Sequence, residues 1–264
     1  MPLLSVENLS MESGPRRRWF KYGLSGEMLL DSVSFEIDPG KCLGLVGGEA
    51  SGKLPVTFAL LGLHSISDGK ITFDGEDLTR LSLRKFRPWR KRIQAVFPDE
   101  FGQLTPRHTL ERSFRHVLKT WYPKAKKEEI HNRIELAMDL VKMPTANRHR
   151  TPPELDPAER QLMAVARAML VEPDLLICHE VTKGLDVAEQ AEVLNRISDI
   201  RDALNLTVML VTDDLAVADH MSDTIAVLHH GRVLETGPAA KIVQHPDHDY
   251  TRRLVSSTLT NFPT

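Results

Sequence analysis

The chain has 264 residues, of which 41% are hydrophobic and 27% charged, so it is long enough to bury one or two globular cores. Lysine and arginine number 34 against 36 aspartate and glutamate residues, and this near-neutral balance argues against a dedicated nucleic-acid binder. Two cysteines, Cys42 and Cys178, exclude a disulfide scaffold and fit a reducing cytosol. No apolar run reaches the roughly 18 residues that span a bilayer, and the N-terminus lacks the pattern of a secretory signal. These features predict a soluble intracellular protein without nucleic-acid partners.

Short apolar runs predict strands along most of the chain. In chain order they cover residues 3–9, 29–37, 42–47, 70–75, 93–97, 174–179, 207–212, 224–230 and 231–237. The runs 174–179 and 207–212 are apolar almost throughout, as strands covered on both faces are. Residues 13–26 are predicted as a loop between the first two strands.

Helical patterns separate these strands. A helix is predicted over 53–63, apolar residues recur at three- and four-residue spacing over 159–170 and 187–204, and no strand-like run interrupts 109–171. This alternation predicts an α/β core with an antiparallel portion near the N-terminus and an inserted helical segment. Cys42 and Cys178 fall in apolar strands and are expected to pack as small hydrophobes.

Residues 47–54 read GGEASGKL, directly after an apolar strand and before a helical run. A phosphate-binding loop has the pattern G-x-x-x-x-G-K followed by Ser or Thr, because its N–H groups and lysine hold phosphates and its hydroxyl holds Mg²⁺. Leu54 stands where the hydroxyl belongs and cannot ligate a metal. The candidate nucleotide-binding residues are Gly47, Gly48, Glu49, Ala50, Ser51, Gly52, Lys53 and Leu54. A glycine-rich turn without a ligand is the alternative interpretation.

A second segment, TPPELDPAERQLMAVARAMLVEPDLLICHEVTKGLDVAEQAEVLN over 151–195, gives this loop its context. Here the chain resembles the ATP-binding subunits of ABC transporters, in the branch of dipeptide, oligopeptide and nickel importers. The resemblance extends to VFPDEFGQLTPRHTL at 96–110, to TVMLVTDDLAVADHMSDTIAVLHHGRVLETG at 207–237 and to HPDHDYTRRL at 245–254.

The resemblance implies an α/β fold of the P-loop NTPase (RecA-like) class, the ABC nucleotide-binding domain. An N-terminal antiparallel β subdomain and an inserted helical subdomain are expected within this single ABC domain. The core with the antiparallel subdomain would span 1–97 and 173–264, and the helical (signature) subdomain would span 98–172.

The chain departs from this family at positions that matter for hydrolysis. By the resemblance, Pro98 replaces the Q-loop glutamine, His179 the Walker B aspartate and Asp213 the switch histidine. Glu180, at the position of the family's catalytic base, and Asp186, in its D-loop, are retained. The full set of degenerate positions is Leu54, Pro98, Asp156, Pro157, Ala158, Glu159, His179 and Asp213. Because phosphoryl transfer depends on positioning and charge neutralisation, these changes predict a vestigial catalytic site.

The family's signature motif, which donates to the γ-phosphate held by a partner subunit, is replaced by LDPAE at 155–159. Asp156 is predicted as a helix N-cap, Pro157 as the first helical residue and Glu159 as the third. The helix end would then be satisfied by its own carboxylates, which would repel ATP across a dimer interface.

The resemblance implies a second ABC ATP-binding subunit and transmembrane permease subunits as partners, and indirectly an extracytoplasmic substrate-binding protein. It places the chain peripherally at the cytoplasmic face of the inner (plasma) membrane. ATP is expected to bind weakly or without Mg²⁺, and no metal site is expected. The favoured function is a catalytically impaired subunit of a peptide- or nickel-type transporter. A working ATPase that uses Lys53 and Glu180, and a soluble regulator derived from an ABC ATPase, are the alternatives.

Two further clusters have plainer interpretations. RKFRPWRKR at 84–92 contains six basic residues and no acid, which fits a solvated face better than a patch for nucleic acid or lipid headgroups. Five of the 11 histidines fall within 220–248 at spacings that match no compact metal motif, so we expect scattered surface histidines there.

Overall fold

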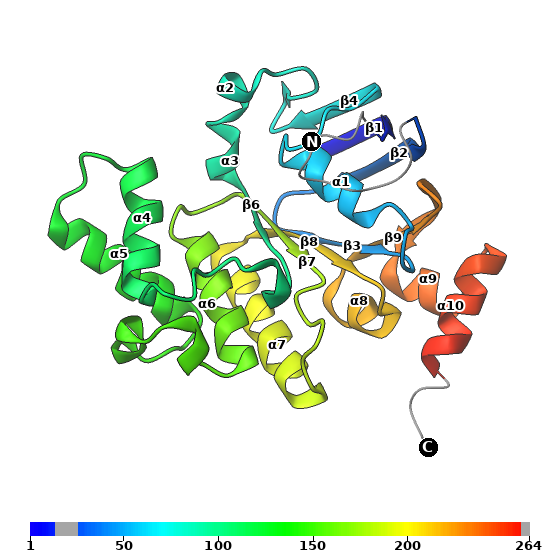
Figure 1. Ribbon diagram of the computed structural model, residues 1–264. Helices are drawn as coiled ribbons and strands as arrows, with labels where there is room; N and C mark the ends of the chain where they lie inside the picture. The colour runs from blue at the N-terminus through cyan, green and yellow to red at the C-terminus, as the bar shows by residue number, and fades with distance from the viewer. Residues whose placement is uncertain (14–25, 260–264) are drawn as a thin grey trace. The chain divides into compact units, whose positions relative to one another are not determined.

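The computed structural model describes residues 1–13 and 26–259, so most of the predicted loop 13–26 lies outside the described residues. The chain forms two compact units (Figure 1). One unit takes in Met1–Arg87 and Thr207–Thr264, and the other is Pro88–Leu206. Within the described ranges, no helix has the length and apolar character needed to cross a membrane.

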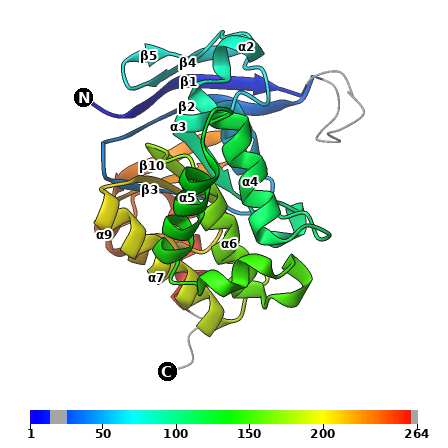
Figure 2. The ribbon, with the colours of Figure 1, turned by 90° about the vertical axis from the view of Figure 1, so that its left-hand side faces the viewer.

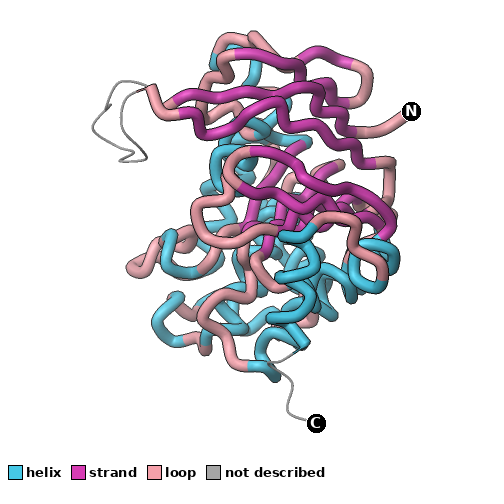
Figure 3. The backbone as a smooth tube through the Cα atoms, turned by 90° about the vertical axis from the view of Figure 1, so that its right-hand side faces the viewer, coloured by secondary structure: helices cyan, strands magenta, loops and turns pink. Residues whose placement is uncertain are grey.

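The first unit contains an antiparallel sheet with the strand order β2-β1-β4-β5, drawn among the magenta strands of Figure 3. Its strands are β1 (Leu4–Glu12), β2 (Met28–Ile37), β4 (Asp68–Phe73) and β5 (Glu76–Asp77). Leu4 pairs with Ile37 on one side and with Phe73 on the other, so β1 lies between β2 and β4. Along β2, Val33, Phe35 and Ile37 are buried while the residues between them are exposed, as in a strand with one face on a core.

A second group of strands in the same unit has the order β10-β9-β3-β8. These strands are β3 (Cys42–Val46), β8 (Thr207–Thr212), β9 (Thr224–His229) and β10 (Arg232–Pro238). β3 runs parallel to β8 and β9, and every residue of β3 and β8 is buried. For β8 this confirms the prediction of a strand covered on both faces. The helices of this unit are α1 (Lys53–Leu60), α2 (Leu83–Phe86), α8 (Leu215–Met221), α9 (Ala239–Gln244) and α10 (Asp249–Leu259).

The unit Pro88–Leu206 combines a parallel strand pair with a group of helices (Figure 2). β6 (Ile93–Val96) pairs with β7 (Leu175–His179), and the residues between them form no strand in the described structure. The helices are α3 (Trp89–Arg92), α4 (Leu110–Trp121), α5 (Lys127–Leu140), α6 (Pro157–Met169) and α7 (Val187–Leu204). Short 3-10 turns cover Asp99–Phe101, Thr145–His149 and Pro152–Glu154. The predicted helical character of 109–171 is thereby confirmed.

The predicted elements agree with the observed ones to within a few residues, with two informative differences. The helix predicted over 53–63 ends at Leu60, because Gly62 takes a left-handed conformation with φ of +59°. The basic run 84–92, predicted only as a solvated face, contributes to α2 and forms α3, and its Phe86 is buried. Cys42 and Cys178 are both buried, as predicted.

Candidate functional site

The candidate phosphate loop follows the fully buried strand β3 and leads into α1. Two backbone hydrogen bonds fix its ends within the first unit. The Gly47 N–H donates to the Thr212 carbonyl at 3.3 Å, and the Gly231 N–H donates to the Ser51 carbonyl at 2.8 Å. The sequence therefore folds here into a strand–loop–helix unit, which is the setting that a phosphate-binding loop requires.

The backbone path of this loop is tight enough to require glycine at two positions. A Cβ atom added at Gly47 would lie 2.2 Å from the Leu228 carbonyl oxygen. Gly52 has a φ of +109°, a conformation that only glycine adopts without strain. Ala50 has a φ of +57°, so its Cβ is held in the left-handed region that residues with a side chain rarely adopt.

Lys53 is buried at the start of α1, and its Nζ donates to the Gly47 carbonyl at 2.5 Å. The first turn of α1 contains no acidic residue and no side-chain cap, which leaves a favourable end for an anion. Leu54 follows and offers no ligand atom. Pro55, which the sequence reasoning overlooked, has no N–H and removes one of the donors of this turn.

Two aspartates follow β8 in the same unit and differ in their contacts. Asp214 is the N-cap of α8, and its Oδ1 accepts from the Ala216 N–H at 2.8 Å and the Val217 N–H at 3.3 Å. Asp213, which the resemblance predicts at the position of the switch histidine, is exposed. The carboxylate at Asp213 is thus presented to solvent at the end of a buried strand.

In the unit Pro88–Leu206, β7 ends at His179, which is only 4% exposed. The imidazole lies against the Phe97 ring, with 5.4 Å between the ring centroids and an interplanar angle of 42°. The Phe97 carbonyl accepts from Gln103 Nε2 at 2.5 Å and from Gln161 Nε2 at 2.9 Å. Pro98 follows Phe97 and precedes the 3-10 turn Asp99–Phe101, so this point has a pyrrolidine ring in place of a side-chain amide.

Glu180 comes directly after β7 with a left-handed φ of +46°. Lys183 places its Nζ 3.6 Å from Glu180 Oε2 and 3.5 Å from Glu100 Oε1. Glu180 first, and Glu100 second, raise the pKa of the Lys183 ammonium above its usual value. The sequence analysis missed Lys183, although a lysine three residues beyond the candidate base was visible in the motif.

The segment 155–159 forms the predicted cap of α6. Asp156 Oδ1 accepts from the Glu159 N–H at 2.7 Å, and Glu159 Oε2 accepts from the Asp156 N–H at 3.1 Å. Pro157 is the first residue of the helix, Ala158 is buried, and Arg150 Nη1 lies 3.4 Å from Glu159 Oε2. The predicted capping arrangement is confirmed, and two carboxylates occupy the helix end.

Asp186, predicted from the resemblance to lie in the D-loop, has the same local role at α7. Its Oδ1 accepts from the Glu189 N–H at 2.9 Å, and Glu189 Oε2 accepts from the Asp186 N–H at 3.0 Å. The side chain is therefore engaged in a capping box.

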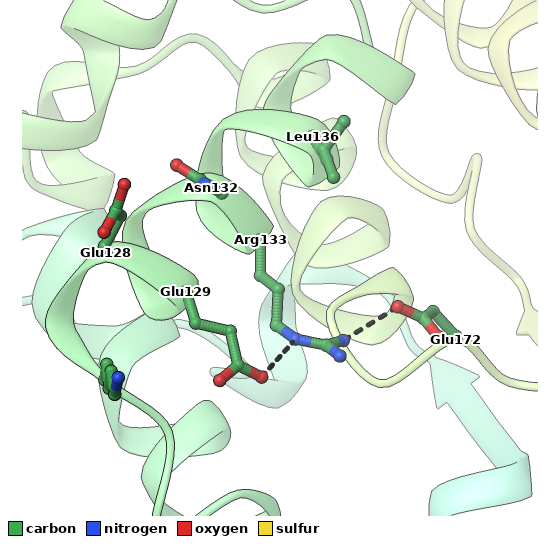
Figure 4. A pocket seen from close by; sticks show the side chains of 7 residues that line it. Glu128, Glu129, Asn132, Arg133, Leu136 and Glu172 are labelled. Atoms are coloured by element: carbon green, nitrogen blue, oxygen red, sulfur yellow. Dashed lines mark hydrogen bonds and ion pairs between the residues drawn. The ribbon is translucent and has the colours of Figure 1, made fainter.

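A pocket at the start of α5 has a different chemistry from a phosphate site (Figure 4). Arg133 is held between Glu172 at 2.7 Å and Glu129 at 3.5 Å. Its guanidinium also lies 4.2 Å from the Tyr122 ring centroid. The only arginine lining this pocket is thus already paired, and Glu128 adds a further carboxylate. This arrangement ties α5 to the turn after α6.

The sequence was compared with known families and proteins. The ABC transporter family profile matches residues 30–183. A putative peptide import ATP-binding protein of Brucella ovis is 35% identical over 256 residues, covering 97% of this chain and 78% of that protein. The oligopeptide transport ATP-binding protein OppF of Escherichia coli is 31% identical over 257 residues, covering 97% of this chain and 77% of that protein.

Solved structures show the same fold at lower identity. CbiO1 from Clostridium perfringens, part of the ABC transporter complex cbiONQ, aligns with a TM-score of 0.80 at 22% identity, covering 99% of this chain and 96% of that chain. The ATP-binding cassette MJ0796, a dimer bound to ADP and Pi, aligns with a TM-score of 0.76 at 20% identity, covering 89% and 98%. These similarities confirm the expected fold, that of an ABC nucleotide-binding domain of the P-loop NTPase class with mixed α/β sheets.

Proposed function

Because this chain belongs to the ABC transporter family, we propose that it is an ATP-binding subunit of a peptide-type importer that holds nucleotide with little or no hydrolysis. The assignment to peptide import rests on the relatives, which include peptide import and oligopeptide transport ATP-binding proteins. The proposal of impaired hydrolysis rests on the side chains of this chain.

The observation that carries this proposal is the burial of His179 against Phe97 at the end of β7. The family resemblance implies an aspartate at this position, where it holds Mg²⁺ through water. A buried imidazole packed on an aromatic ring supplies no carboxylate oxygen. Mg²⁺ strongly prefers oxygen ligands, so this residue does not suit the ion.

Two other positions support the same conclusion. Leu54 follows Lys53 where a hydroxyl would ligate Mg²⁺, and an aliphatic side chain offers no donor atom. Pro98 stands where an amide oxygen would reach the metal and the attacking water. The residues present therefore fit Mg²⁺ poorly, and we derive no catalytic step that depends on this ion.

The residues that remain suit the phosphates of a nucleotide better than they suit the metal. Lys53 supplies a cation at the start of α1, and Gly47 and Gly52 permit the close backbone path of the loop. Binding would be weakened because Pro55 supplies no backbone N–H and because the side chains that would ligate Mg²⁺ are replaced. We therefore propose that ATP binds to this loop weakly or without Mg²⁺.

Lys183 gives a further reason for slow hydrolysis. The Lys183 ammonium lies 3.6 Å from Glu180 Oε2 and pairs with the carboxylate that would have to accept a proton from water. Proton abstraction from water by Glu180 would also have to proceed without the carboxylate that the resemblance implies at the neighbouring position, which is His179 in this chain. Phosphoryl transfer depends on such groups for most of its acceleration.

The signature segment extends the effect to a partner. In the dimer that the resemblance implies, each nucleotide lies between the phosphate loop of one chain and the signature of the other. Asp156 and Glu159 would face the phosphates held by a second ATP-binding subunit and repel them. Both sites of such a pair would then be altered by this chain.

The proposed assembly includes a second ATP-binding subunit, transmembrane permease subunits and, indirectly, an extracytoplasmic substrate-binding protein. We place the chain peripherally at the cytoplasmic face of the inner membrane. Within it, we assign 1–97 and 173–264 to the core with the antiparallel subdomain and 98–172 to the helical subdomain. The parallel pairing of β6 with β7 and the helices between them support these boundaries.

A working ATPase is the second candidate, and the retention of Glu180 and Lys53 favours it. Release of inorganic phosphate from Mg²⁺-ATP by the purified chain separates the two functions, with E. coli OppF assayed in parallel. We expect a rate far below that of OppF and unchanged by Glu180→Gln. A rate equal to that of OppF which Glu180→Gln abolishes would overturn the proposed impairment.

A further inference from the structure

The phosphate loop has a third backbone attachment, which comes from the C-terminal helix. The Gly48 N–H donates to the Tyr250 hydroxyl at 3.2 Å, between residues 202 positions apart in the sequence. The other two attachments come from the adjacent strand β8 and from the turn between β9 and β10. Tyr250 is thus the one side chain among these three partners, since the other two are backbone groups.

Tyr250 is oriented by several contacts within the first unit. Its ring stacks on His229, with 3.8 Å between centroids and an interplanar angle of 25°. Its N–H donates to His248 Nδ1 at 3.1 Å. Further along α10, Leu254 and Val255 pack against the core between β3, β9, α8 and α9. These contacts fix the ring before any ligand binds.

The start of α10 is also attached to β10. Glu235 Oε1 accepts from the Asp247 N–H at 2.8 Å, and Glu235 Oε2 accepts from the His248 N–H at 3.2 Å. A carboxylate that accepts two backbone donors gives a strong and directional attachment. The chain is therefore attached to β10 just before Tyr250 and packed on the core just after it. The Tyr250 hydroxyl reaches Gly48 from this fixed segment.

We propose that Tyr250 is a positioning residue of the nucleotide site, whose hydroxyl holds the Gly48 limb of the phosphate loop in the shape that binds phosphate. Gly48 has no side chain to restrict its backbone, so a fixed acceptor for its N–H limits the conformations of the loop. A loop ordered in advance binds its ligand more tightly, because less conformational entropy is lost on binding. This inference rests on the proposed function, since it concerns the binding of nucleotide by this loop.

Tyr250→Phe tests the inference because it removes the hydroxyl and keeps the ring stacked on His229. Tyr122→Phe is the matched control, since Tyr122 lies in the other unit and contacts Lys91 and Arg133. Two quantities are measured on the full chain: hydrogen exchange of the Gly48 amide, and the Kd for ATP in EDTA by calorimetry. Melting temperatures check that all variants fold.

We expect Tyr250→Phe to speed exchange at Gly48 and to weaken ATP binding by about 2- to 10-fold, the range for loss of one hydrogen bond. Tyr122→Phe should change neither quantity. Unchanged exchange at Gly48, or an unchanged Kd in Tyr250→Phe, would overturn the inference. If the wild-type chain itself binds no ATP, the proposed function fails first and the inference about its nucleotide site fails with it.

Discussion

Replacement of Asp156 tests whether the signature segment of this chain acts as a helix cap. In Asp156→Ala the Glu159 N–H loses the acceptor that lies 2.7 Å away. Loss of an N-cap acceptor costs about 1 kcal/mol, within a range of 0.5–2 kcal/mol. Loss of a carboxylate at a helix N-terminus adds roughly 0.3–1 kcal/mol. We therefore expect the free energy of unfolding to fall by about 1–2 kcal/mol.

Asp156→Ser removes the carboxylate charge but keeps a side-chain oxygen that can cap the helix. Serine caps a helix about as well as aspartate, so this variant should lose only the roughly 0.3–1 kcal/mol assigned to the carboxylate charge. Asp186→Ala serves as an internal standard, because Asp186 and Glu189 form the same reciprocal pair at α7. It should be destabilised to a similar extent as Asp156→Ala.

Equilibrium unfolding in urea, followed by circular dichroism, measures these differences. With a slope of about 3 kcal/mol per molar urea, Asp156→Ala should lower the midpoint by about 0.3–0.7 M without changing the slope. A midpoint equal to that of the wild-type chain would refute the capping role. A loss in Asp156→Ser as large as that in Asp156→Ala would show that the charge, and not the cap, stabilises α6.

Three further predictions concern the metal, the loop and pH. The variant Leu54→Ser restores a hydroxyl oxygen directly after Lys53, so calorimetry should show ATP binding that tightens when Mg²⁺ is added; identical binding with and without Mg²⁺ would contradict the metal position assigned to residue 54. Ala50→Gly relieves a left-handed alanine and should raise the free energy of unfolding by about 1 kcal/mol in urea titrations, whereas a decrease would contradict the strain assigned there. Burial, with neighbouring basic side chains, lowers the pKa of His229 below 6.5, so below that pH the unfolded chain binds more protons and stability falls. His229→Phe should therefore lose less stability between pH 7 and pH 5, and an equal loss in both chains would count against the assigned titration.

Local patterns in the sequence were sufficient for most elements and for the cap of α6. The alternation along β2, the continuous apolar runs of β3 and β8, and the Asp-Pro-Ala-Glu segment each carry their structural information within a few residues. Such short-range signals reflect backbone hydrogen bonding and burial, which act between neighbours in the chain.

The contacts that distinguish this site from a generic phosphate loop could not be predicted in the same way. The hydroxyl of Tyr250 reaches Gly48 across 202 positions, and Lys183 bridges Glu180 and the distant Glu100. These pairs depend on how the segments pack in three dimensions. The sequence alone indicated that a histidine, His179, replaces the family's aspartate. Its packing on the Phe97 ring could be seen only in the structure.

The proposed function depends most on the binding of nucleotide by the phosphate loop without Mg²⁺. Equilibrium titration of the purified chain with ATP, first in Mg²⁺ and then in EDTA, tests it most directly. Lys53→Ala serves as the control, because this cation should account for part of any binding. We expect measurable binding of similar affinity in both buffers, which Lys53→Ala weakens. Binding that requires Mg²⁺, or no binding in either buffer, would contradict it.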